Sequence, residues 1–146
     1  MSLNGSSQGS PARGPRQTDI VVLGAEWQTR ALLRAQLIEQ GFEVLATDTW
    51  PMMRQYLRPG WKPRLAIVDV KGLPDPERVL NDLRILMKPN RVLVLTAIDT
   101  VSPDVIERLG FRVLKRPVLI GDVVTAAARA LREQRTEVIG ETTRTP

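Results

Sequence analysis

The stretch Arg64-Leu65-Ala66-Ile67-Val68-Asp69-Val70 predicts more about the fold than any other part of the chain. Its apolar residues follow one another without alternation, and Gly72 and Pro74 end the run. A short apolar run between turn residues is typical of a strand buried on both faces, in the middle of a parallel sheet. A charged Asp69 is costly at the end of such a strand unless other groups hold it. Ligands of open α/β sheets bind beyond the carboxyl ends of the strands, so Asp69 is the first candidate for a functional site.

The composition excludes several classes of function. The chain has 146 residues, of which 42% are hydrophobic and 25% charged, as is ordinary for one globular domain. It contains no cysteine and no histidine, which excludes disulfides, thiolate metal sites and histidine ligands or bases. The apolar runs are too short to span a bilayer and no signal peptide is visible, so we expect a cytoplasmic protein without membrane contact. The net charge of +5 comes from scattered basic residues, a pattern that disfavours nucleic acid as a partner.

Apolar strands and helical patterns alternate along the rest of the chain. Further strands are predicted at 19–23, 42–46, 91–95 and 111–114, and helices at about 26–40, 49–57, 75–87, 102–109 and 120–133. Short connections and right-handed crossovers between them predict a three-layer α/β/α sandwich around a parallel sheet. We expect residues 19–134 to form this single domain, residues 1–18 to be a disordered tail and residues 135–146 to be a flexible tail.

The helical spacing also predicts which side chains face the core. The predicted inner positions are Trp27, Ala31, Leu33, Leu37 and Ile38 in the first helix, and Met52, Met53, Tyr56 and Leu57 in the second. Thr49 and Asp75 stand where their side chains could cap the second and third helices. Trp61, in the loop before residue 64, is the tryptophan that we expect to be exposed.

Several stretches together resemble the receiver domain of bacterial two-component response regulators. They are, in chain order, Glu26 with Arg30 and Leu32-Leu33, then Ala66-Ile67-Val68-Asp69-Val70, Val94-Leu95-Thr96-Ala97 and Arg116-Pro117-Val118. The resemblance covers about residues 19–134 and implies the flavodoxin-like (CheY-like) fold, a five-stranded parallel sheet in the order 2-1-3-4-5. It also implies that Asp69 matches the phospho-accepting aspartate and Thr96 the switch threonine. Arg116-Pro117 then matches the Lys-Pro turn of the family, which contains a cis peptide bond.

The chain departs from this family at the metal site. A working receiver has two adjacent acidic residues after its first strand, and they hold Mg²⁺ beside the phospho-acceptor. Gly24 and Ala25 stand at the matching positions. Mg²⁺ is usually held by one or two carboxylates with phosphate oxygens and water, and Asp69 alone is a poor site. We therefore expect that magnesium binding is lost, that no metal or other cofactor is bound, and that Glu26 does not substitute for the missing pair.

A second departure is Arg116, which stands where the family has lysine. A lysine ammonium is compact and mobile, whereas the planar guanidinium of arginine suits a close contact with a carboxylate. Our hypothesis is that Arg116 pairs directly with Asp69 and fills part of the space that a metal ion and a phosphoryl group would need.

These features predict an atypical receiver, or pseudo-receiver, that is not an enzyme and acts in signal transduction through protein contacts. The expected partner is a histidine kinase, a regulator or a second copy of the chain, bound at the family's helix-four, strand-five and helix-five face (102–109, 111–114 and 120–133). One alternative is a functional single-domain response regulator that is phosphorylated on Asp69. Another is a small-molecule binder at the switch point of the sheet.

Overall fold

A computed structural model describes the backbone of residues 18–144 and the side chains up to residue 136. The predicted N-terminal tail, apart from its last residue, lies outside the described residues. The sheet consists of parallel strands β2 (Ile20–Gly24), β3 (Val44–Thr47), β4 (Leu65–Asp69), β5 (Val92–Leu95) and β6 (Arg112–Leu114). Their order, β3-β2-β4-β5-β6, is the order 2-1-3-4-5 when the strands are counted along the chain. The predicted fold class and strand order are confirmed.

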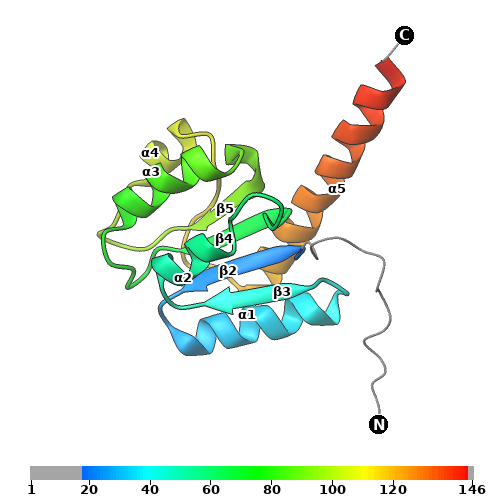
Figure 1. Ribbon diagram of the computed structural model, residues 1–146. Helices are drawn as coiled ribbons and strands as arrows, with labels where there is room; N and C mark the ends of the chain where they lie inside the picture. Colours follow the sequence, from blue (N-terminus) through cyan, green and yellow to red (C-terminus); the bar gives the residue numbers. More distant parts are fainter. Residues whose placement is uncertain (1–17, 145–146) are drawn as a thin grey trace.

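Two layers of helices enclose this sheet (Figure 1). Helices α1 (Trp27–Glu39) and α5 (Ile120–Arg144) cover one face, and α2 (Trp50–Gln55), α3 (Pro76–Leu86) and α4 (Pro103–Arg108) cover the other. Strand β4 contributes Leu65 and Ile67 to the first interface and Ala66 and Val68 to the second. Every residue of β4 is buried, because successive side chains point to opposite faces and both faces are covered.

Local signals place the starts of the helices. The Thr49 hydroxyl accepts a hydrogen bond from the Met52 N–H at 3.4 Å, and the Ser102 hydroxyl accepts one from the Val105 N–H at 3.3 Å. These contacts satisfy backbone donors that the first turn of a helix leaves without partners. Asp75 precedes α3, but its φ of +48° is left-handed and its side chain makes no capping hydrogen bond. The prediction that the Asp75 side chain caps α3 is therefore wrong.

The buried face of α1 is narrower than the sequence predicts. Leu33 and Leu37 are buried, but Ala31 is exposed, and Trp27 and Ile38 remain 66% and 42% exposed. Leu33 and Leu37 are four residues apart and define the inward stripe, and the other three positions turn away from it.

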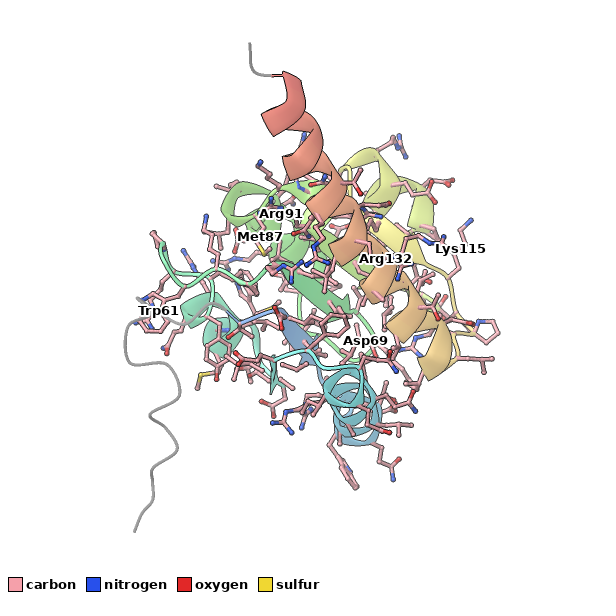
Figure 2. The ribbon with its side chains drawn as sticks, turned by 90° about the vertical axis from the view of Figure 1, so that its right-hand side faces the viewer. Trp61, Asp69, Met87, Arg91, Lys115 and Arg132 are labelled. Carbon is pink, nitrogen blue, oxygen red and sulfur yellow. The ribbon has the colours of Figure 1, made fainter. Side chains whose placement is uncertain are left out.

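In α2, Met52 is likewise on the outside, so its predicted burial is wrong, whereas Met53 is buried. Trp61 stands at the edge of the domain, exposed as predicted (Figure 2).

Helix α5 continues through Arg144, so its predicted end at Glu133 is wrong and residues 135–144 are helical (Figure 1). No proline interrupts this segment before Pro146, and the glycine at position 140 lowers helix propensity by only about 1 kcal/mol. Within the described part of the chain, none of the helices combines the length and the apolar content needed to cross a membrane.

Candidate functional site

Asp69 is the last residue of β4 and lies at the carboxyl edge of the sheet, as predicted. Asp69 is only 4% exposed, so its carboxylate needs hydrogen-bonding or charged partners in the protein. One partner is local, since the Oδ1 atom accepts a hydrogen bond from the Lys71 backbone N–H at 3.0 Å. This is the turn geometry in which an aspartate side chain bonds the backbone two residues further on.

Arg116 is the second partner of Asp69. Its Nη2 atom lies 2.5 Å from Asp69 Oδ2, and the two side chains are 23% and 6% exposed. The predicted ion pair is therefore present, and it joins the loop after β6 to the end of β4. The Arg116-Pro117 peptide bond is cis, in agreement with the resemblance stated above. Asp69 thus has a donor on each carboxylate oxygen.

Thr96 holds the backbone of Arg116 through a hydrogen bond. It follows β5, is 5% exposed, and its hydroxyl oxygen accepts a hydrogen bond from the Arg116 N–H at 3.1 Å. The Thr96 N–H in turn donates to the Leu114 carbonyl at 3.0 Å. Thr96 therefore belongs to the same cluster as Asp69 and Arg116, whereas its role as a switch stays a prediction.

Replacing Thr96 by valine should lower the free energy of unfolding by about 1–3 kcal/mol, because the Arg116 N–H would lose its acceptor in a part-buried position. Urea denaturation followed by tryptophan fluorescence measures this change. Thr96→Ser keeps the hydroxyl and should retain most of the stability. Equal losses in the two variants would contradict a role for this hydrogen bond.

The site contains no second carboxylate beside Asp69 at the positions where the family has its acidic pair. Gly24 is paired with Asp69 in the sheet register, and Ala25 after it is exposed. The Gly24 carbonyl accepts a hydrogen bond from Arg30 Nη1 at 2.6 Å. A Cβ atom at Gly24 would lie 3.7 Å from Arg30 Cβ and 3.8 Å from Asp69 Cβ, which is ordinary contact distance. There is room for a side chain at this position, but the chain supplies none.

Glu26 is committed to other partners. Its carboxylate accepts a hydrogen bond from the Thr29 hydroxyl at 2.6 Å and pairs with Lys71 Nζ at 3.3 Å. The Thr29 hydrogen bond, followed by the Lys71 ammonium, lowers the pKa of the exposed Glu26 carboxyl. Lys71 was not identified from the sequence as part of this site, although its position two residues after Asp69 placed it at the same edge. Among the described residues, no three acidic, histidine or cysteine side chains gather in a way that could hold a metal ion.

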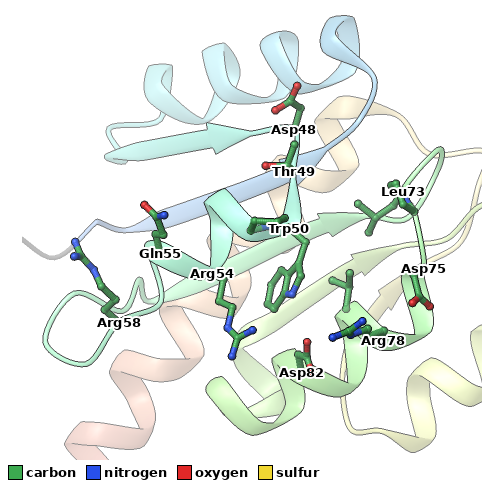
Figure 3. A pocket seen from close by; sticks show the side chains of 13 residues that line it. Asp48, Thr49, Trp50, Arg54, Gln55, Arg58, Leu73, Asp75, Arg78 and Asp82 are labelled. Carbon is green, nitrogen blue, oxygen red and sulfur yellow. The ribbon is translucent and has the colours of Figure 1, made fainter.

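A separate groove of about 900 Å³ lies beside the switch point, between α2 and α3 (Figure 3). Trp50, Leu73 and Val79 contribute apolar surface to it, and Arg54 and Arg78 extend from its two helices. The sequence did not predict it, because it depends on the distance between two helices that are separated by a strand. The expectation of a small-molecule site at the switch point itself stays a prediction.

Comparison with solved structures identifies the fold. The receiver domain of a putative LuxO repressor protein from Vibrio parahaemolyticus matches with a TM-score of 0.71 and 22% identity, covering 86% of this chain and 98% of that one. A CheY-like response regulator receiver domain from Methanospirillum hungatei JF-1 matches with a TM-score of 0.70 and 20% identity, covering 84% and 99%. The receiver domain of NtrX from Brucella abortus matches with a TM-score of 0.66 and 21% identity, covering 78% and 98%.

No protein-family model matches the chain, and no curated protein matches it either. The similarity is therefore one of three-dimensional structure at low sequence identity, and it shows that the chain has the fold of receiver domains.

Proposed function

We propose that this chain is an atypical receiver domain, a pseudo-receiver, that signals through protein contacts without Mg²⁺-dependent phosphorylation of Asp69 and catalyses no reaction itself. The observation that carries the proposal is the ion pair between Arg116 and Asp69 at 2.5 Å, at the carboxyl end of β4. Since the Lys71 N–H occupies the other carboxylate oxygen, each potential attacking atom already has a hydrogen-bond donor.

The chemistry of phosphoryl transfer supports this reading. The protein contributes mainly positioning and charge neutralisation, and metal ions neutralise much of the developing charge. Gly24 and Ala25 offer no side-chain oxygen for a metal ion, and Glu26 is bound to Lys71. Asp69 would have to release Arg116 and react without the metal that lowers the barrier.

Exposed apolar side chains favour protein contacts near this edge of the sheet. Ile98, in the loop after β5, is 84% exposed, and Leu119, in the loop before α5, is 73% exposed. Both loops border the face formed by α4, β6 and α5, where β6 is also the last strand of the sheet. Exposed apolar side chains in loops beside one face can serve as contacts for a partner. We therefore propose that the partner, a kinase, a regulator or a second copy, binds at this face.

Phosphorylation is the direct test. Incubating the protein with Mg²⁺ and acetyl phosphate should give no Asp69-dependent incorporation of phosphate, as measured by intact-mass spectrometry. Asp69→Asn is the matched control, because it keeps the shape of the side chain and removes the nucleophilic carboxylate. Stoichiometric labelling that requires Mg²⁺ and disappears in Asp69→Asn would instead establish the alternative, a functional single-domain response regulator.

A further inference from the structure

A second groove lies at the opposite end of the sheet from Asp69, where the strands begin. It has a volume of about 460 Å³ and is formed by the end of α3, the 3-10 turn η2 (Pro89–Arg91) and the loop before β4. Figure 2 looks onto this end, with Arg91 and Met87 close together. Its basic lining residues are Lys62, Arg84, Lys88 and Arg91. Its apolar ones are Pro63, Ile85, Leu86, Met87 and Pro89.

All the charged residues that line this groove are basic. None of its lining residues is acidic. Among the residues that the structure describes, Arg84, Lys88 and Arg91 have no side-chain hydrogen bond or ion pair. A concave surface lined by one sign of charge concentrates ions of the opposite sign. The groove therefore favours an anionic occupant.

Two acidic residues near the starts of the strands are paired with basic residues that do not line the groove. Asp19, just before β2, pairs with Arg64 at 3.3 Å. Glu133 on α5 pairs with Arg112, the first residue of β6, at 2.9 Å. Both carboxylates are thereby engaged by basic residues outside the groove.

The apolar part of the lining narrows the class of occupant. Ile85 is 83% exposed and lines the same groove as the four basic residues. Nucleic acid fits this lining poorly. Its phosphate groups make no favourable contact with an apolar side chain, and its bases bind mainly by stacking on aromatic rings, which this lining does not contain. An anionic membrane surface is flat, whereas this site is concave. Carboxylates with an intervening apolar side chain fit both parts of the lining.

We propose that this groove, lined by Lys62, Arg84, Lys88 and Arg91 together with Ile85, docks an acidic segment of a partner protein. Its carboxylates contact the basic residues and an apolar side chain covers Ile85. The site lies at the other end of the sheet from Asp69 and shares no residue with the Asp69 contacts to Lys71 and Arg116. The receiver fold would then hold two partners at once, one at each end of its sheet.

The test uses a fluorescein-labelled peptide with a repeated Glu-Glu-Leu sequence, and fluorescence anisotropy against the full chain at low salt. The paired charge reversal Arg84→Glu with Lys88→Glu should weaken peptide binding at least ~10-fold, since like charges then oppose the carboxylates. Arg34→Glu with Arg129→Glu is the matched control. It changes the net charge by the same amount at two exposed positions, on α1 and α5, and should weaken binding far less. Ile85→Ser should weaken peptide binding by a smaller factor.

Three results would overturn the proposal. The first is the absence of peptide binding at low salt. The second is equal weakening by the groove pair and the control pair, which would reduce the effect to net charge. The third is tighter binding of a single-stranded oligonucleotide or of anionic lipid vesicles that is lost in the groove pair and unaffected by Ile85→Ser. Urea denaturation of each variant confirms that it is folded.

Discussion

Replacing Arg116 by alanine should lower the free energy of unfolding by about 3–5 kcal/mol, because it leaves the buried Asp69 carboxylate without its counter-charge. Because Asp69 is buried and Arg116 is only 23% exposed, this is the strongest single effect that we expect from an ion pair among the described residues. Urea denaturation at neutral pH measures it. Arg112→Ala is the matched control, since it removes an arginine from a more exposed pair with Glu133, worth about 1 kcal/mol or less. It also removes the hydrogen bond from Arg112 Nε to the Asn90 carbonyl at 2.8 Å, worth about 1 kcal/mol, so its total cost should still be below that of Arg116→Ala.

Removing the carboxylate as well should restore part of the loss. In the double variant Arg116→Ala with Asp69→Asn no charge is left uncompensated, so it should be more stable than Arg116→Ala alone. If the double variant is as unstable as the single one, an uncompensated Asp69 charge is not the cause of the loss. A loss below about 1 kcal/mol in Arg116→Ala would lead to the same conclusion.

Restoring the missing groups should convert the domain into a phosphorylated receiver. The triple variant Gly24→Asp, Ala25→Asp and Arg116→Lys adds two carboxylates beside Asp69 and frees the Asp69 oxygen that Arg116 occupies. The contact distances at Gly24 leave room for the first new side chain. We expect the Mg²⁺-dependent rate of labelling by acetyl phosphate to rise by about 100-fold or more, the scale on which single electrostatic groups act in catalysis.

Control variants distinguish Mg²⁺-dependent phosphorylation of Asp69 from unspecific labelling by acetyl phosphate. The same triple variant with Asp69→Asn should remain unlabelled, and chelation of Mg²⁺ with EDTA should abolish labelling of the triple variant. The variant with Arg116→Lys alone should gain little, because it still lacks a metal site. If the triple variant labels no faster than the unmodified chain, Gly24, Ala25 and Arg116 are not what would prevent phosphorylation of Asp69, and this part of the proposed function is wrong.

The sequence predicted the sheet and the position of Asp69 because the relevant signals are local. A continuous apolar run such as Leu65–Asp69 can be stable only where both faces are covered, so its place in the centre follows from the residues themselves. The contact between Arg116 and Asp69 was also predictable, but only through the resemblance, since 47 residues separate the two in the chain. The buried faces of the helices were less predictable, since Trp27 and Met52 are exposed although we predicted that they face the core. A short buried stripe such as Leu33 and Leu37 does not determine whether the apolar residues beside it are buried.

The chain of amino acids thus specifies the layers of the fold, the strand that carries Asp69 and the absence of acidic side chains at Gly24 and Ala25, since each depends on residue type and order. Tertiary packing specifies the contacts between residues that are far apart in the sequence. Lys71 forms an ion pair with Glu26, and four basic residues line one groove with Ile85, only because the strands and helices bring distant segments together. These contacts depend on distances in space, which periodicity and composition do not contain.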